Sequence, residues 1–251
     1  MTYCLAIKLN EGLVFCSDSR THAGADQVSS YSKMHRFSMF DDRELVVLTA
    51  GNLATTQAVI ATLTRDVQEE ASFNLGTVRY VSEMADYIGR LSIEIQGKYK
   101  AGGAVAGFDS SASFIVGGQI GNEKQCLYMV YPEGNHISAS HQHPFLQIGE
   151  TKYGKPLLER IIKPTTDPET AMRCALVSMD STMRSNATVG PPIELLYFAG
   201  NHAKADTQYH LFEKSDPFLV KLSQSWEEKI CQAFNELPKL DEVFNASLLN
   251  G

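Results

Sequence analysis

Apolar and polar residues alternate near the start of the chain, and this period of two predicts β-strands. Residues 3–10 alternate, residues 10–12 have the composition of a turn, and residues 13–16 form a short apolar run. The pattern predicts that the chain opens with a β-hairpin. Asp18 follows the second strand, so it is expected to lie back near the N-terminus. Residues 19–30, rich in Gly, Ser and Thr, are expected to form a loop.

The pattern changes after a second predicted hairpin. Residues 34–40 and 44–49 flank an Asp-Asp turn and have strand composition. Asn52 is a suitable N-cap for a helix that follows them. Apolar residues then recur at helical spacing, which predicts two helices that pair with each other. The first carries the stripe Leu53, Ile60, Leu63 and Val67, and the second covers residues 77–99.

The rest of the chain alternates between the two patterns. Strands are predicted at 112–120, 126–131, 136–140, 145–148, 193–199 and 207–213, and helices at 155–163, from Asp167-Pro168 onward, and at 218–237. Sheets built from hairpins are mostly antiparallel, and each needs its apolar face covered. The order of elements therefore predicts a four-layer α/β/β/α sandwich of the α/β (α+β) class.

Composition narrows the class of protein. The chain has 251 residues, of which 43% are hydrophobic, and a net charge of −7. No linker, low-complexity run or fixed repeat divides it, so a single domain over residues 1–251 is expected. Scattered basic residues argue against a nucleic-acid partner. Neither a signal-like segment nor a bilayer-length apolar run is found, so a soluble, cytoplasmic protein without a membrane partner is expected.

Cysteine and histidine give no sign of a disulfide framework or a metal site. The cysteines are odd in number, far apart and without a CxxC pair, so they are expected to be buried thiols in a reducing compartment: Cys4, Cys16, Cys126, Cys174 and Cys231. His141 and His143 are two residues apart, but no third ligand at matching spacing accompanies them. We therefore expect no metal and no cofactor.

Thr2 is a candidate nucleophile. Methionine aminopeptidase removes an initiator Met that precedes a small residue, which would leave Thr2 with a free amine beside its hydroxyl. An α-amino group has a pKa of about 7.7–8.0, so it is partly neutral at cell pH and can act as the base for that hydroxyl. Thr is also a common second residue, so Met1-Thr2 alone does not establish catalysis.

Several motifs in fixed order give Thr2 a context. Taken together, Thr2, residues 17–20 (SDSR), residues 23–24 (AG), Lys33 and residues 49–51 (TAG) resemble the proteasome β-subunit and HslV peptidase family. The stretches 2–10, 17–20, 31–37, 149–156 and 179–190 look closer still to the bacterial Anbu branch of that family. The resemblance implies the fold of N-terminal nucleophile hydrolases.

The resemblance also implies roles for particular residues. Thr2 matches the nucleophile, Asp18 the conserved aspartate, and Lys33 the lysine, with one residue fewer between Asp18 and Lys33 than usual. Held by Asp18, the Lys33 ammonium would favour the deprotonated forms of the Thr2 hydroxyl and amine. Without the resemblance, these two side chains would indicate an ordinary surface ion pair. Gly51 matches the glycine whose N–H binds the oxyanion, and it is also a residue that a tight turn requires.

The second half of the chain matches the family less closely. Asp180 lies on the apolar stripe of its helix and matches the second aspartate, expected near the Thr2 amine, while Ser185 is a looser match to the serine that follows. Residues 149–151 are Gly-Glu-Thr where most members have Gly-Ser-Gly. Glu150 would place an anion beside the amine and favour its protonated form.

The resemblance further implies a pocket and partners. The side chain before the scissile bond would be bound by Thr21, Thr49 and Leu53. A threonine-type endopeptidase acting on peptides or unfolded polypeptides is expected, as a homo-oligomer in a ring or open ring, with an unfoldase partner left open. Two alternatives remain: an amidohydrolase of the same fold that acts on small amides, and a latent, ring-forming scaffold protein.

Overall fold

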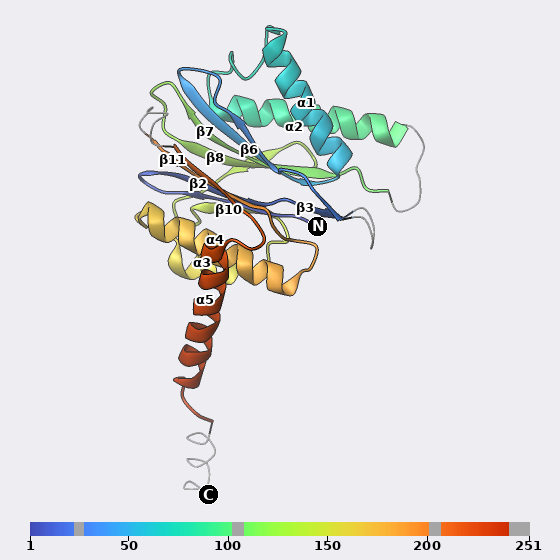
Figure 1. The fold of residues 1–251 in the computed structure, drawn as a ribbon. Helices are drawn as coiled ribbons and strands as arrows, with labels where there is room; N and C mark the ends of the chain where they lie inside the picture. Colours follow the sequence, from blue (N-terminus) through green and yellow to red (C-terminus); the bar gives the residue numbers. More distant parts are fainter. Residues whose placement is uncertain (23–27, 102–107, 201–206, 241–251) are drawn as a thin grey trace, which may run out of the picture. The chain divides into compact units, whose positions relative to one another are not determined.

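Two five-stranded antiparallel sheets form the centre of the larger of two units in the computed structural model (Figure 1). The units are Met1–Lys214 and Ser215–Gly251, and the structure describes residues 1–22, 28–101, 108–200 and 207–240. The first sheet has the order β10-β1-β2-β11-β12, with β1 (Tyr3–Lys8), β2 (Gly12–Asp18), β10 (Phe145–Gly149), β11 (Ile193–Ala199) and β12 (Thr207–Phe212). The second has the order β5-β6-β7-β8-β9, with β5 (Met34–Phe37), β6 (Arg43–Gly51), β7 (Ala112–Ile120), β8 (Cys126–Val130) and β9 (His136–Ser138).

The opening hairpin occupies the middle of the first sheet. β1 pairs with β2 on one side and with β10 on the other, so Cys4 lies opposite both Ser17 and Ile148. Every residue of β2 is buried. Such a strand is covered on both faces, which explains why its apolar run does not alternate. The predicted hairpin is confirmed, and both of its strands are fixed by neighbours.

A continuous apolar core lies between the sheets. It is built from side chains that alternate along each strand, because successive residues of a strand point to opposite faces. The main contributors are Cys4, Ala6, Leu13, Phe15, Leu196 and Phe198 from the first sheet and Val46, Leu48, Ala50, Ile115 and Leu127 from the second. Tyr3, which precedes Cys4 in β1, points the other way and hydrogen-bonds Ser178 of a helix.

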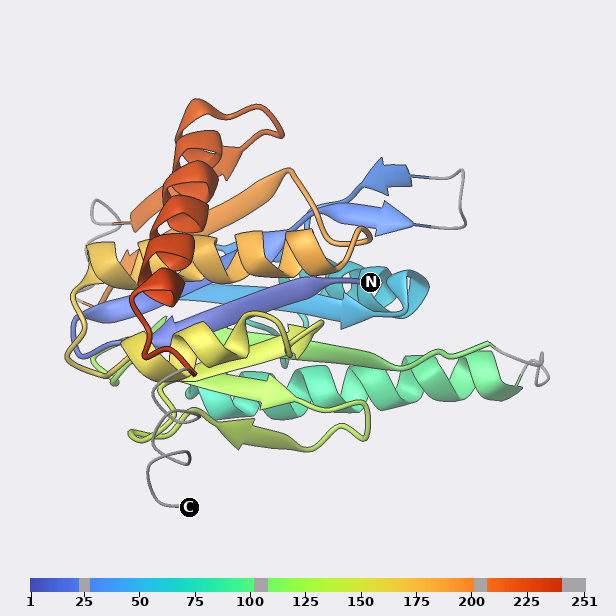
Figure 2. The same ribbon diagram turned by 90° about the horizontal axis from the view of Figure 1, so that it is seen from below.

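Helices cover the outer face of each sheet. α1 (Leu53–Gln68) and α2 (Val81–Ala101) pack on the second sheet, and α3 (Lys155–Ile161) and α4 (Pro168–Ser185) lie on the side of the first (Figures 1 and 2). Asn52 caps α1 by accepting from the Thr55 N–H, as its position in the sequence predicted. The four-layer α/β/β/α prediction is confirmed.

The structure corrects two predictions of local structure. Part of the expected loop over residues 19–30 is a small hairpin, β3 (Arg20–His22) paired with β4 (Val28–Ser30), at the same end of the sandwich as the N-terminus (Figures 1 and 2). Its short polar strands have no apolar alternation to reveal them. The Ala-Gly motif at 23–24 lies outside the described residues. α2 begins at Val81 rather than at residue 77, because Asn74 and Thr77 hydrogen-bond each other in a separate turn.

The second unit contains α5 (Pro217–Asn235), capped by the Asp216 side chain. None of its residues is buried. Cys231 is exposed there and Cys126 is half-buried, so the expectation of five buried thiols holds for Cys4, Cys16 and Cys174 alone. The prediction of a single domain over residues 1–251 stays a prediction. No helix within the described ranges is long and apolar enough to cross a membrane.

Candidate active site

A cavity of about 390 Å³ opens where the chain begins. We call it the Thr2 cavity; its walls come from the two residues before β1, from β3, from Lys33, from the junction of β6 with α1, and from the end of β10. The lining residues are Met1, Thr2, Thr21, Lys33, Thr49, Ala50, Gly51, Leu53, Thr56 and Gly149. The structure therefore brings together six of the candidate catalytic and substrate-binding residues, namely Thr2, Thr21, Lys33, Thr49, Gly51 and Leu53. A larger cavity, of about 990 Å³, lies by Lys8, Glu11 and Gln125 and contains none of them.

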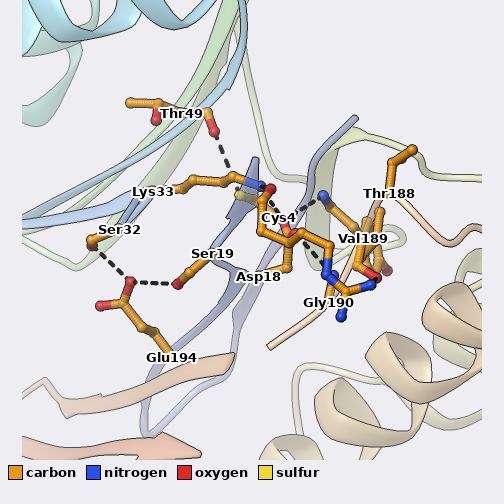
Figure 3. A network of polar contacts seen from close by, with 12 residues as sticks. Cys4, Asp18, Ser19, Ser32, Lys33, Thr49, Thr188, Val189, Gly190 and Glu194 are labelled. Carbon is orange, nitrogen blue, oxygen red and sulfur yellow. Dashed lines mark hydrogen bonds and ion pairs between the residues drawn. The ribbon is translucent and has the colours of Figure 1, made fainter. Parts of the chain in front are cut away.

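The polar centre beneath the Thr2 cavity is an ion pair between Asp18 and Lys33 (Figure 3). Lys33 Nζ donates to Asp18 Oδ1 at 2.7 Å and to the carbonyl of Arg20 at 2.7 Å. The side chains are 7% and 0% exposed. This burial rules out the ordinary surface ion pair as a description of the two residues. A buried pair of this kind is stable only when further hydrogen bonds satisfy its charges.

Backbone N–H groups complete the environment of Asp18. Tyr3 N donates to Oδ1 at 3.0 Å and Gly190 N donates to Oδ2 at 3.1 Å. Burial raises the pKa of Asp18, while Lys33 and the two N–H groups oppose that rise. The carboxylate thus joins the first strand, Lys33 and the segment that follows α4. Its geometry fixes the direction in which the Lys33 ammonium points.

The α-amine in this structure belongs to Met1, which is next to Thr2. Burial is the largest cause that lowers the pKa of this amine, and Lys33 lowers it further, whereas Asp18 and Glu150 raise it. An amine with a lowered pKa has a larger neutral fraction at cell pH, and a neutral amine can accept a proton. The cavity therefore favours the basic form of an amine placed at its mouth.

The main chain of Thr2 is held from both sides. Its carbonyl accepts from Glu150 N at 2.7 Å, and the following N–H is the one bound by Asp18. Gly149 has φ +82°, and a Cβ there would lie 2.0 Å from the Thr2 carbonyl oxygen. A side chain at residue 149 would displace Thr2. This close approach is one physical reason for the glycine.

Gly51 ends β6 immediately before the N-cap of α1. Its φ is +105°, and a Cβ would lie 2.4 Å from the Ser111 carbonyl oxygen. Conformation and crowding therefore both require glycine here, whatever its chemical role. Gly51 also lines the Thr2 cavity, so its backbone borders the same space as Thr2.

Asp180 and Ser185 do not line the Thr2 cavity. The Asp180 carboxylate lies 3.3 Å from Arg184 Nε, one turn later in α4. Ser185 is exposed at the last position of that helix. Their assigned roles beside the amine stay predictions, without support from the geometry.

Glu150 is buried beside the cavity rather than in its wall. Its carboxylate accepts from Asn186 Nδ2 at 2.9 Å and lies 3.3 Å from Lys152 Nζ. The side chain thus ties the turn after β10 to the residue that caps the end of α4. Its charge raises the pKa of the Met1 amine. The same effect on a Thr2 amine stays a prediction.

The sequence did not reveal every residue at this end of the fold. Thr56 lines the cavity, and Gly190 supplies an N–H to Asp18. Glu194 is a buried carboxylate bound by Ser19 and Ser32, beside the ion pair (Figure 3). A single acidic residue inside the apolar strand 193–199 was a readable signal for Glu194. Gly190 had none, because its contribution is a backbone group. Among the described residues, no group of three His, Cys, Asp or Glu side chains could hold a metal ion.

The paired sheets, the two helix layers and the position of the cavity at the start of β1 define the proteasome-type fold of the N-terminal nucleophile hydrolase class. The chain belongs to the proteasome subunit family, whose model matches residues 2–198. No curated protein matches in a sequence comparison.

Solved structures place the chain near the Anbu branch, as the resemblance indicated. It is similar to Anbu (ancestral beta-subunit) from Yersinia bercovieri, with 37% identity and a TM-score of 0.87, over 95% of this chain and 99% of that one. A helical assembly of the Anbu complex from Pseudomonas aeruginosa is 38% identical, with a TM-score of 0.88, over 94% and 97%. Anbu from Hyphomicrobium sp. strain MC1 is 35% identical, with a TM-score of 0.85, over 94% and 98%.

The buried ion pair gives a testable pH dependence of stability. Lys33→Met keeps the apolar stem and removes the ammonium, which leaves the Asp18 charge buried without its cation. We expect the free energy of unfolding, measured with urea, to fall by about 3 kcal/mol at pH 8. The loss should be smaller at pH 5. Without Lys33 the pKa of Asp18 in the folded variant rises further, so protonation of this carboxyl stabilises the folded variant. That stabilisation is fully present below the unfolded-state pKa of about 3.9 and is lost as pH rises through the folded-state pKa.

Lys155→Met is the matched control, because Lys155 is half-exposed and pairs with Glu159 one turn away in α3. Its effect should be below about 1 kcal/mol at both pH values. A Lys33→Met loss that is equal at pH 5 and pH 8 would contradict the assigned charge state of Asp18.

Proposed function

We propose that this protein is a threonine-type endopeptidase, an N-terminal nucleophile hydrolase that uses Thr2 after removal of Met1. The observation that carries the proposal is the Thr2 cavity itself. It holds Thr2 and Gly51 together, above the buried ion pair of Asp18 and Lys33. Nucleophile, charge stabiliser and backbone donor are the parts that acyl transfer requires.

In the first half of the reaction the Thr2 hydroxyl attacks the peptide carbonyl. Its proton passes to the Thr2 amine, directly or through one water. The Lys33 ammonium stabilises the developing alkoxide, and Asp18 keeps that ammonium in place. Negative charge that forms on the carbonyl oxygen is stabilised by the N–H of Gly51.

The second half releases the products. The tetrahedral intermediate collapses as the C–N bond breaks, the protonated amine returns its proton to the leaving nitrogen, and an ester remains on the Thr2 oxygen. Water then attacks the ester carbonyl, with the same amine as base. The carboxylic acid leaves and the hydroxyl is restored.

Met1 blocks this sequence in two ways. While it is attached, the nitrogen of Thr2 is an amide and cannot serve as a base. Met1 also lines the Thr2 cavity, where a substrate would approach. Removal of Met1 is therefore a required step of the proposal.

The lining of the cavity supports a preference for a neutral side chain of modest size. Thr21, Thr49 and Thr56 contribute hydroxyls and methyl groups, Leu53 contributes an apolar surface, and the Lys33 charge is already paired. A charged substrate side chain would find no free partner among these residues. Small amides would also fit a cavity of about 390 Å³, so an amidohydrolase of the same fold is the second candidate.

We extend the proposal to assembly: the protein forms a homo-oligomer, as a ring or an open ring. The support is the similarity to the Pseudomonas aeruginosa Anbu complex, which is a helical assembly. Assembly through non-closing contacts produces helical arrangements, whereas closing contacts produce rings.

The proposal predicts that mass and activity change together. Protein made in cells with active methionine aminopeptidase should lack Met1 by intact mass, and this species should cleave fluorogenic peptides and accept an epoxyketone or vinyl-sulfone probe at Thr2. Thr2→Ala should lower both signals by at least about 1,000-fold, because the nucleophile is lost. Thr2→Ser is the matched control and should keep a measurable part of the activity, since it retains a hydroxyl and an amine.

Insertion of Ala between Met1 and Thr2 separates the amine from the nucleophile. The variant should still lose Met1, but Ala then precedes Thr2 and the protein should be inactive. Wild-type turnover by this variant, or by protein verified to carry Met1, would show that the N-terminal nucleophile mechanism is wrong.

The charge of Glu150 should be visible in the pH dependence of kcat/KM. Glu150→Gln keeps an oxygen that can accept from Asn186 but removes an anion that raises the pKa of the Met1 amine, and we expect it to act in the same direction on the Thr2 amine. We expect the acid limb of the profile to move to lower pH, by up to about one unit, which corresponds to about 1.4 kcal/mol. Glu159→Gln, in the exposed pair of α3, controls for the change in net charge. Superimposable profiles for Glu150→Gln and wild type would mean that this charge does not reach the amine.

The assembly proposal predicts a mass of several subunits. Light scattering at micromolar concentration should give a multiple of the 27.7 kDa chain mass. A monomer under these conditions would contradict the proposal.

A further inference from the structure

Glu194 is a buried carboxylate next to the candidate active site that the proposed reaction does not use. It lies on β11, opposite Ser17, in the register that places Ile193 opposite Asp18. The residue is 5% exposed. Among the described residues, no Lys, Arg or His forms an ion pair with it. A buried charge without a cation is costly unless hydrogen-bond donors replace water around it.

Three hydroxyl groups supply those donors. Ser32 Oγ lies 2.7 Å and Ser19 Oγ 3.5 Å from Oε1, and Tyr209 Oη lies 2.9 Å from Oε2. Ser32 Oγ is also 2.9 Å from the Met34 carbonyl, but its single proton is better placed on the closer, charged acceptor. Burial and the Glu194 charge raise the pKa of Tyr209 to about 12, so its hydroxyl keeps the proton that it donates.

The two serines are the first and last residues of one segment, 19–32, which we call the excursion between Asp18 and Lys33. Ser19 directly follows Asp18, Ser32 directly precedes Lys33, and the hairpin of β3 and β4 lies between them. At the base of this excursion, Tyr31 N donates to the Ser19 carbonyl at 2.9 Å. Oε1 of Glu194 therefore links Ser19, which follows Asp18, to Ser32, which precedes Lys33 (Figure 3).

We propose that Glu194 is a positioning residue, which holds Ser19 and Ser32 together so that the Lys33 ammonium stays on Asp18 and faces Thr2. Its effect on rate rests on the proposed function, whereas its effect on the chain between Ser19 and Lys33 does not. Tyr209 is bound to the other oxygen and comes from β12, outside this excursion. It therefore offers a matched control on the same carboxylate.

Four substitutions distinguish the tie, meaning the hydrogen bonds of Ser19 and Ser32 to Glu194, from the effect of merely having a buried side chain at residue 194. Glu194→Gln keeps a carbonyl oxygen for both serines, and its amide can donate to Tyr209 Oη, so the tie survives. Glu194→Ala removes the tie. Ser32→Ala removes the shorter of the two serine hydrogen bonds to Glu194 and leaves the hydroxyls of Ser19 and Tyr209 as donors to the carboxylate. This milder variant keeps the test possible if Glu194→Ala does not fold. Tyr209→Phe removes a hydrogen bond to the same group without touching either end of the excursion.

The first readout is the rate at which a vinyl-sulfone probe labels Thr2 as pH is varied. We expect Glu194→Ala and Ser32→Ala to slow labelling by about 10-fold or more, Glu194→Gln by less than about 3-fold and Tyr209→Phe by less than about 2-fold. In the slow variants the acid limb should move to higher pH, because Lys33 lowers the pKa of an amine at this position, as it does for Met1, and a displaced Lys33 no longer does so. Unchanged labelling by Glu194→Ala and Ser32→Ala in an active protein would overturn the proposal, as would equal losses in Tyr209→Phe.

The second readout does not need an active enzyme. Hydrogen exchange is measured at the Tyr31 amide, which binds the Ser19 carbonyl, and at the Thr49 amide, which binds the Lys33 carbonyl. Both should exchange about 10-fold faster in Glu194→Ala and Ser32→Ala, and at the wild-type rate in Glu194→Gln and Tyr209→Phe. Wild-type exchange in the first two variants would overturn the inference. If wild type and Thr2→Ala are equally unlabelled while exchange changes as expected, the proposed function fails and the positioning role of Glu194 stands.

Discussion

The Asp18 carboxylate, taken out of water and paired with Lys33, is the interaction on which this end of the molecule depends. It binds the ammonium of Lys33, the N–H that follows Thr2 and the N–H of Gly190. These groups come from segments far apart in the sequence. Because a buried charge that loses a partner is destabilising by several kcal/mol, the three segments are coupled to one another. The residue proposed as nucleophile therefore lies on a main chain fixed by the same carboxylate that orients the proposed charge stabiliser.

Close backbone approach is the second constraint on the site. At Gly149 and Gly51 a Cβ would meet carbonyl oxygens at 2.0 and 2.4 Å, and both residues have positive φ. The space saved by the missing side chains lets the turn after β10 contact Thr2 and lets β6 lead directly into α1. Pre-organised backbone of this kind does not have to rearrange when charge develops in a reaction. The two glycines thus serve conformation and, in the proposed mechanism, chemistry.

Charge around the amine is balanced between opposing effects. Burial and Lys33 lower the pKa of the Met1 amine, while Asp18 and Glu150 raise it. Glu150 differs from the residue that most of the family has in this turn, yet its side chain is held by Asn186 and Lys152 and does not line the cavity. Its influence on the amine is therefore electrostatic and indirect. Glu194 belongs to the same pattern of buried carboxylates held by hydrogen bonds, with hydroxyl donors in place of a cation.

The sequence by itself determined the layers of the fold, because the periods of two and of nearly four report which face of a strand or helix is buried. The family resemblance, which rests on the order of motifs along the chain, also identified Thr2, Asp18, Lys33 and Gly51, and the structure places them at one end of the sandwich. The polar hairpin of β3 and β4 was missed, since backbone pairing without an apolar face leaves no periodic signal. The resemblance implied that Asp180 lies near the Thr2 amine, but the partner observed in the structure is Arg184, one turn away. Only the tertiary structure decided that the ion pair is buried, that Gly190 completes it and that Glu194 joins its flanking residues, because burial and backbone donation depend on segments that are distant in sequence.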